Sequence, residues 1–450
     1  MQPKDENILH NIEKRLYERF VKSSDFMCKN VVIGSGRFRA YFLETLVDLP
    51  ETMSAMNYTS AEHNDHSEPD KPEPIVNDSP KSLDELSNDL LQGKLVLFNM
   101  DGLLTVIEPK QPQISRPISI PNSENPLHSA FDAFTEDINK NIGLLRKKIL
   151  TDQLIVETRY AGVQSTKKLA IIYLEGVSQK KVIQAIREKL DQNQDKELTT
   201  VRDLTNILGH PRISMTPSYV PSELPGETVQ NLLNGKVVIM IDQFSFAFAF
   251  PAIITDLWST TLDVSYPYLF QWFLRTIRAV AALIALTLPG LYVVFNSVNQ
   301  ELLRIQLAVS VAKSREGVPY PSIIEMLLVM LLLEMVIEAT IRLPKNIGPT
   351  ITMIGGVLLG QAIVQAKLVS NLLIIILVAS AIANFALSNY MNSINVRLYK
   401  YVVMFSSALF GIWGLEAAMI WIIFYYASLN HCSVPYLSFS VKEKGKTPDE

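Results

Sequence analysis

The chain has 450 residues, and 48% of them are hydrophobic while only 19% are charged, which is too apolar for an ordinary soluble enzyme of this length. Its formal net charge of −4 lacks the basic balance that nucleic acid binding favours. Only Cys28 and Cys432 are present, so one chain can form neither a disulfide framework nor a cysteine-based zinc site. We therefore expect part of the chain to lie in a lipid membrane.

Polar and apolar residues are separated along the chain. Residues 1 to about 274 are rich in Asp, Glu, Lys and Asn, whereas apolar runs dominate from about 276 to 427. The N-terminus has no basic stretch leading into an apolar one, so we expect no cleaved signal peptide. The sequence predicts an α+β cytosolic region of two related α/β subdomains, followed by an all-α, multi-span membrane domain.

Changes in composition set the expected boundaries. Two stretches rich in proline and polar residues cannot bury enough apolar surface to order themselves, and they are interpreted as linkers. The expected units are an N-terminal subdomain at 1–108 with a flexible linker at about 51–80, a linker at 109–125, a second subdomain at 126–265, a transmembrane helical domain at 266–430 and a polar C-terminal tail at 431–450.

An internal repeat relates the two cytosolic subdomains. Residues 91–101 (LQGKLVLFNMD) recur as 233–242 (LNGKVVIMID), with the same Gly-Lys step and the same closing Asp. Each copy predicts the end of an amphipathic helix, a turn at Gly93-Lys94 or Gly235-Lys236, and a buried strand. The repeat indicates a duplicated α/β unit.

Motifs for catalysis or metal binding are missing from the sequence. It contains no His-Glu-x-x-His, Cys-x-x-Cys, complete Walker loop or Gly-x-Ser-x-Gly. The Gly-Ser-Gly loop at 34–36 lacks a Gly-Lys-Ser/Thr ending and is interpreted as a hairpin turn. His63 and His66 lie in the acidic linker and are interpreted as solvated rather than as metal ligands. We expect no enzymatic activity, no cofactor and no metal.

The C-terminal half contains several apolar runs. Residues 279–298 are nearly uncharged and match the length that a ~30 Å hydrocarbon core requires. Three further apolar runs follow, at 350–366, 371–387 and 401–427. Small residues at Gly355, Gly356 and Gly360 predict close helix packing in the first of these three.

Residues 323–342 are as long as a membrane span but carry charges. On a helix, Glu334, Glu338 and Arg342 lie along one stripe, while Glu325 falls on the opposite face. Insertion scales assign roughly 2.5 to 3.5 kcal/mol to each central ionised residue, so the stripe must face protein or water. Two interpretations remain open: an interhelical ion pair that fixes packing, or the polar lining of an ion or substrate path.

Basic residues near the span ends constrain the topology. Arg275 and Arg278 place the start of the first span in the cytosol. If every apolar run crosses, the C-terminal lysines lie outside, against the same rule. We therefore expect that one segment, either 323–342 or the apolar stretch at 305–311 before it, does not cross and is re-entrant or lies on the membrane surface.

Several motifs in this half occur together. They are a loop with Ser314, Arg315, Glu316, Gly317, Pro319 and Pro321, an Arg-Leu-Pro-Lys-Asn-Ile-Gly segment at 342–348, the glycine-containing helix at 354–362 and Ser-Asn-Tyr at 388–390. In this order they resemble the A subunit of the GerA family of spore germination proteins, and the resemblance extends from roughly residue 24 to 427. The chain departs from the family pattern at 125–131, 212–217 and Pro349.

The resemblance implies a function and partners. It implies a multi-pass subunit of a nutrient germinant receptor in the inner membrane of a bacterial spore, or the cell membrane of a spore former, with its N-terminal region cytosolic. Implied partners are the membrane, further copies of the same chain, a transporter-like B subunit and a lipoprotein C subunit, and the implied activity is ligand-gated ion release by the oligomer. A non-conducting assembly or signalling scaffold and a transporter-like protein are the alternatives. Nucleic acid is not an expected partner.

Overall fold

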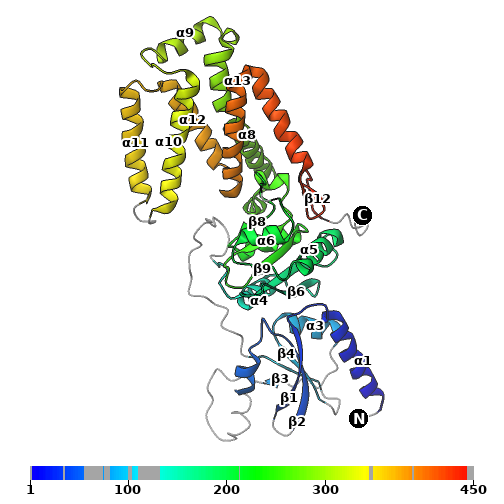
Figure 1. Ribbon diagram of the computed structural model, residues 1–450. Helices are drawn as coiled ribbons and strands as arrows, with labels where there is room; N and C mark the ends of the chain where they lie inside the picture. Colours follow the sequence, from blue (N-terminus) through cyan, green and yellow to red (C-terminus); the bar gives the residue numbers. More distant parts are fainter. Residues whose placement is uncertain are drawn as a thin grey trace.

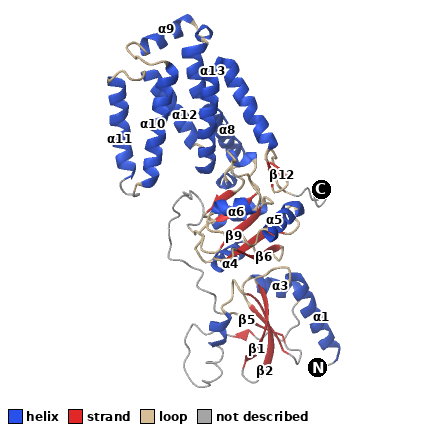
Figure 2. Ribbon diagram, viewed as in Figure 1, coloured by secondary structure: helices blue, strands red, loops and turns tan. Residues whose placement is uncertain are grey.

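The computed structural model describes residues 3–33, 36–54, 74–75, 82–99, 104–109, 132–211, 213–343, 348–387 and 390–442. Nearly all of the two expected linkers, including His63 and His66, lies outside the described residues. Two units built on β-sheets and one bundle of helices follow one another in chain order (Figure 1). Helices accompany the strands in the two sheet units, whereas the C-terminal bundle is built from helices (Figure 2).

The first subdomain is an antiparallel sheet covered by helices. Its strand order is β1-β2-β4-β5-β3. Its elements are α1 (Pro3–Phe20), β1 (Phe26–Ile33), β2 (Gly36–Leu43), β3 (Pro74–Ile75), α3 (Leu83–Leu91), β4 (Leu95–Asn99) and β5 (Leu104–Ile107). Leu16 from α1 and Leu86 and Leu90 from α3 are fully buried in its core. Ile33 pairs with Gly36, so the expected hairpin between β1 and β2 is confirmed.

The second subdomain repeats this topology with strand order β6-β7-β9-β10-β8. Its elements are α4 (Ile138–Lys148), β6 (Leu154–Ala161), β7 (Lys167–Leu174), α5 (Lys180–Gln192), α6 (Val201–Ile207), β8 (Val220–Ser222), α7 (Pro225–Leu233), β9 (Val237–Ile241) and β10 (Ala247–Phe250). Successive β7 residues point to opposite faces. Ile171 joins the core under α5 and α6, whereas Ile172 joins the core under α4 and α7.

The repeated Gly-Lys step has the same setting in both subdomains. Gly93 follows α3 with φ 84° and Gly235 follows α7 with φ 85°, a left-handed backbone that glycine adopts without a Cβ penalty. Strands β4 and β9 then begin two residues later, at Leu95 and Val237. The predicted helix, turn and buried strand are therefore confirmed in each copy.

A helical bundle forms the C-terminal half. Its elements are η1 (Ile254–Leu257), η2 (Thr261–Ser265), α8 (Tyr268–Val293), η3 (Val294–Val298), η4 (Gln300–Leu302), α9 (Ile305–Ser314), α10 (Ser322–Arg342), α11 (Gly348–Gln365), α12 (Asn371–Phe385) and α13 (Tyr390–Ser428). By length and composition, two stretches in the described part can span a membrane, Tyr268–Val298 and Tyr390–Ser428. The shorter apolar helices are Gly355–Gln365 and Asn371–Phe385. Apolar side chains from α8, α10, α12 and α13 meet in one core.

The chain reverses direction within α13. Gly411 has φ 62° and ψ −140°, and Asn299 Oδ1 accepts a hydrogen bond of 3.0 Å from the Ile412 amide just beyond it. A straight helix would separate Tyr399 from Tyr426 by about 40 Å at 1.5 Å per residue, whereas their ring centroids are 5.6 Å apart. The apolar run at 401–427 therefore does not form one continuous helix: two antiparallel halves form a hairpin (Figure 1).

The reversal returns the C-terminal segment to the second subdomain. Val434 and Val441 are buried in the core on the α5 side of its sheet. The Ile254 amide donates a hydrogen bond of 2.8 Å to the Tyr436 carbonyl. The sequence interpretation assigned 431–450 to a polar tail, but the described part, 431–442, contains these buried apolar side chains because it completes that core.

Reciprocal ion pairs join the two subdomains. Arg19, near the end of α1, contacts Asp152 of the second subdomain, and Arg146 of α4 contacts Asp25 of the first. In each repeat the arginine precedes its aspartate by six positions, so each subdomain gives its arginine to the aspartate of the other. This exchange has the pattern of a two-fold interface between identical chains. We call these two pairs the clasp.

The Arg146–Asp25 half of the clasp is buried. The two side chains are 1% and 4% exposed, and Arg146 donates to both Asp25 oxygens at 2.9 and 2.8 Å. Ser23 accepts a further hydrogen bond from Arg146 and donates to Asp25. Burial raises the pKa of the Asp25 carboxyl, but the charge and hydrogen bonds of Arg146 outweigh it and hold that pKa below its usual value.

We expect Arg146→Met to lower the free energy of unfolding of the N-terminal region by about 3 to 5 kcal/mol, because Asp25 then keeps a buried charge without its partner. Lys22→Met is the control, since Lys22 and Glu175 are 58% and 50% exposed and such a pair contributes about 0 to 1 kcal/mol. Pulse proteolysis in urea measures both. Because the folded pKa of Asp25 is lowered, the stabilisation is present above the unfolded pKa of about 3.9 and is lost as pH falls through the folded pKa. A gap between wild type and variant that stayed constant below pH 4 would contradict this assignment.

Candidate functional site

The loop between α9 and α10 is tied to the bundle by a buried ion pair. Glu325, in the first turn of α10, is fully buried, and Arg315 Nε lies 3.5 Å from its Oε2. Arg315 also donates to the carbonyls of Tyr320, at 3.1 Å, and Asn296, at 3.4 Å. The arginine of the sequence motif therefore links its own loop, η3 and α10.

Two elements besides the Arg315 loop converge on the same carboxylate. The Tyr292 hydroxyl on α8 donates to Glu325 Oε2 at 3.2 Å, and the Ser370 amide donates to Oε1. Ser370 is the N-cap of α12, so the positive end of that helix dipole also favours the glutamate charge. We call Tyr292, Arg315, Glu325 and Ser370 the Glu325 cluster. It fixes the relative positions of α8, α10 and α12 at the end of the bundle away from the sheets.

The other residues of the motif loop shape its path. Gly317 has φ 87°, and Pro321 is the N-cap residue of α10. Ser314 Oγ donates to the Val311 carbonyl at 2.8 Å, which ends α9. Glu316 and Pro319 are exposed. These residues set the turn, while Arg315 alone among them reaches the Glu325 cluster.

The predicted charged stripe on α10 divides into two pairs. Glu334 forms an ion pair of 3.1 Å with Arg397 of α13, and the Arg397 side chain is 10% exposed. Glu338 and Arg342 pair with each other at 2.8 Å and are 59% and 78% exposed. One chain therefore covers the Glu334 end of the stripe and leaves the Glu338 end open.

The small residues predicted to pack α11 face open space. Gly355, Gly356 and Gly360 have no described atom within 4 Å of the position a Cβ would occupy. Within the described residues they make no close helix contact, so the surface they form remains available to something outside this chain.

A junction centred on Asp256 joins the second subdomain to the bundle. Its Oδ1 forms an ion pair of 2.7 Å with Lys236, and its Oδ2 accepts a hydrogen bond of 2.8 Å from the Ile253 amide. Its backbone carbonyl accepts a hydrogen bond of 2.8 Å from Asn392, at the start of α13. Thr216 contacts the Tyr399 hydroxyl of α13 at 3.2 Å nearby. We call Lys236, Asp256 and Asn392 the junction triad.

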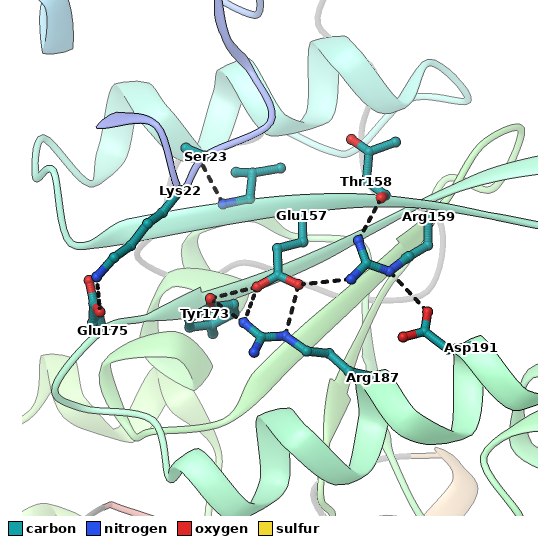
Figure 3. Close-up of polar contacts among 10 residues, drawn as sticks. Lys22, Ser23, Glu157, Thr158, Arg159, Tyr173, Glu175, Arg187 and Asp191 are labelled. Atoms are coloured by element: carbon teal, nitrogen blue, oxygen red, sulfur yellow. Dashed lines mark hydrogen bonds and ion pairs between the residues drawn. The ribbon is translucent and has the colours of Figure 1, made fainter. Parts of the chain in front are cut away.

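The α5 face of the second sheet carries a second polar network. Figure 3 shows Glu157 of β6 between Arg187 of α5, Tyr173 of β7 and Arg159, with Asp191 beyond. Burial and the Glu157 charge raise the pKa of Tyr173, so its hydroxyl stays protonated and donates to Glu157 at 2.6 Å. Every charge drawn there has a partner, which suits a structural role on this face.

Sequence reasoning missed most of these partners. The sequence analysis singled out the segments that contain Arg315, Glu325 and Lys236. Their partners carry no local pattern, because Glu325 lies 10 residues after Arg315, Ser370 lies 45 after Glu325, and Asp256 lies 20 after Lys236. The clasp did leave a signal, because Arg and Asp recur at the same spacing just before β1 and β6. The alignment of the repeats matched Asp25 with Asp152, and extending it to the arginine six residues before each aspartate would have revealed the clasp.

Comparison with known proteins gives a match over most of the chain. The model of the family described as Bacillus/Clostridium GerA spore germination protein matches residues 14–447. Spore germination protein A1 of Bacillus subtilis (strain 168) is 31% identical over 332 residues, which cover 73% of this chain and 69% of that protein. Spore germination protein KA of the same organism is 28% identical over 358 residues, which cover 80% of this chain and 66% of that protein, just under two thirds of its length.

One solved structure is also similar. It is the crystal structure of the N-terminal domain of the A subunit of the Bacillus megaterium spore germinant receptor GerK3. The match has 21% identity and a TM-score of 0.39, and it covers 54% of this chain and 94% of that chain.

We expect Arg315→Met to destabilise the helical domain far more than Arg342→Met. Removing Arg315 leaves the buried Glu325 without its cation, which costs about 3 to 5 kcal/mol, whereas the exposed Arg342 pair contributes about 0.3 to 0.5 kcal/mol. Thermal unfolding of the purified proteins in one detergent measures the difference. Equal melting temperatures for the two variants would show that the Glu325 cluster does not hold the bundle together.

Proposed function

The chain belongs to the GerA family of spore germination proteins, and on this premise we propose that it is the A subunit of a nutrient germinant receptor that couples germinant sensing to ion release. It is a membrane protein with two candidate spans in its described part. In the proposal several copies of the chain assemble into a ligand-gated ion channel, together with a transporter-like B subunit and a lipoprotein C subunit.

The open end of the α10 stripe carries this proposal. Glu338 and Arg342 are more than half exposed on a helix whose other residues are largely apolar. Facing lipid, an ionised group costs roughly 2.5 to 3.5 kcal/mol at the centre of the bilayer and less toward the helix end, where Glu338 and Arg342 lie. A neighbouring copy or a water-filled path removes this cost, and both are features of an oligomeric channel.

The junction triad supports the coupling part of the proposal. Asp256 receives Lys236 from the second subdomain and Asn392 from α13, and α13 also supplies Arg397 to Glu334 of the stripe. Movement of the second subdomain would therefore act on the helix that holds one end of the stripe.

A non-conducting scaffold is the second candidate. The observation that favours it is the direct pairing of Glu338 with Arg342 at i,i+4, which satisfies both charges without an ion path. Planar-bilayer conductance of the purified oligomer separates the two, because only the channel conducts.

In spores, we expect Glu338→Gln to weaken germinant-triggered cation release more than it lowers the amount of the protein. The exposed side chain contributes little to folding of one chain, whereas a path or a closed oligomer depends on its charge. Glu301→Gln is the matched control, since Glu301 is exposed in η4. Cation release and membrane abundance are measured together, and normal release at normal abundance would remove the stripe from the mechanism.

The hairpin of α13 supports a revised topology within this proposal. With α8, α10, α11, α12 and both halves of α13 crossing, the C-terminal segment returns to the side of Arg275 and Arg278. Lys442 then obeys the positive-inside rule without any re-entrant segment. The short helix α9, which buries none of its residues in this chain, lies on the opposite membrane surface.

Cysteine labelling tests this topology. In a chain carrying Cys28→Ser, we expect Ser440→Cys to resist a membrane-impermeant thiol reagent added to sealed cells, and Ser310→Cys on α9 to react. Both positions are exposed, and the remaining Cys432 is buried. External labelling of Ser440→Cys would overturn the revised topology and restore the count in which each apolar run crosses once.

A further inference from the structure

A polar cavity lies where the second subdomain, the base of α8 and the C-terminal segment meet. Its volume is about 260 Å³. Lys236, Asp256 and Arg275 line it from the first two elements, and Ser440 and Lys442 line it from the third. Gly235 closes the wall between them, because a Cβ at that position would stand 3.0 Å from the Lys442 Cα.

The charges that line this cavity are unbalanced. Lys236, Arg275 and Lys442 supply three cations, and Asp256 is the single carboxylate among the lining residues. Asp256 is already engaged by Lys236 at 2.7 Å. Arg275 lies 3.7 Å from Asp263, whose carboxylate is bound more closely by Arg278 at 2.7 Å. The cavity therefore favours an anion.

Two buried donors in the lining have no hydrogen-bond acceptor among the described residues. One is the Asn231 side-chain nitrogen, on a residue that is 4% exposed. The other is Arg275 Nε, whose ion-pair partner Asp263 Oδ2 lies 3.7 Å away, beyond hydrogen-bond distance. Buried polar groups in folded proteins are nearly always satisfied. Both unsatisfied atoms are donors, so the missing partner is an acceptor with several oxygens, as a phosphate group is.

The rim of the cavity is apolar and continues onto a membrane helix. Phe439 and Val264, which line the cavity, are 78% and 51% exposed. The first turns of α8 expose Tyr268 by 82% and Trp272 by 61%. Aromatic side chains at the start of a spanning helix lie at the depth of the lipid headgroups. A soluble anion makes no favourable contact with an apolar rim, whereas the acyl chains of a phospholipid can pack against it.

We propose that this cavity binds the phosphate of an anionic phospholipid headgroup, through Arg275, Lys442 and the Asn231 amide. The lipid occupies the place where the junction triad connects the sheet to the bundle, and its acyl chains extend along the exposed face of α8. The ligand chemistry is phosphate. A free phosphate ion is the other source of the same chemistry, and the experiment separates the two.

The test uses the full chain, purified in neutral detergent and transferred to nanodiscs of phosphatidylcholine and phosphatidylglycerol at a ratio of about 4:1. Retained phosphatidylglycerol is counted by native mass spectrometry after release. The site variant is Arg275→Gln with Lys442→Gln, and the matched control is Arg304→Gln with Lys313→Gln, which removes the same charges at the opposite end of the bundle, where both are exposed. Sodium phosphate is added as competitor in a parallel series.

We expect wild type and control to retain phosphatidylglycerol in preference to phosphatidylcholine, and the site variant to bind it about tenfold more weakly, since two charge-assisted contacts are lost. Equal retention by wild type and site variant, or no preference in wild type, would overturn the proposal. Binding of inorganic phosphate with the same dependence on the site, but without lipid retention, would overturn the lipid as its source. If the double variant has a lower melting temperature than wild type, retention is compared between wild type and Lys442→Gln alone, because the exposed Lys442 side chain does not stabilise the fold. Binding is measured on the purified chain, so failure of the channel proposal leaves this result unchanged.

Discussion

Asp256 is the residue through which the sheet and the helices are held together. It offers three acceptors to three different parts of the chain: one carboxylate oxygen to Lys236, the other to the Ile253 amide, and the carbonyl to Asn392. Lys236 is only 4% exposed in this pair, so loss of either charge would leave the other largely buried at a cost of about 3 to 5 kcal/mol. The contact between α13 and the second subdomain therefore depends on Asp256, whose ion pair with Lys236 is lost at a large cost in stability when either charge is removed.

The duplicated subdomains use the same residues for different purposes. After its Gly turn, Lys94 pairs at 2.8 Å with Asp89 of its own subdomain, whereas Lys236 reaches 20 residues ahead to the junction. The arginine and aspartate before the first strand of each copy did not diverge in this way, because each needs the other copy as its partner. One repeat therefore joins the membrane domain, and the clasp joins the other repeat to it.

Local sequence patterns predicted the parts of this structure that local forces determine. The Gly-Lys turns, the buried strands after them and the charged helix at 322–342 follow from hydrophobic period and glycine conformation, and each is present. The reversal at Gly411 was not predicted, because an apolar run has the same composition whether the helix continues or folds back. Its signals are Gly411 itself and Asn299, more than a hundred residues away, whose side chain accepts the freed Ile412 amide.

In the candidate site, too, the sequence predicted the local pattern but not the contacts between distant segments. The stripe was predicted from helical period alone, and period cannot say that Arg397 covers Glu334 while Glu338 stays open. The buried carboxylate of Glu325 is held by groups from more than one element, namely Tyr292, Arg315 and Ser370. Such clusters have one well-satisfied arrangement and resist small displacement. An element that responds to a ligand must therefore move against surfaces that one chain leaves uncovered, and in the described residues these include the Glu338 end of α10 and the glycine face of α11.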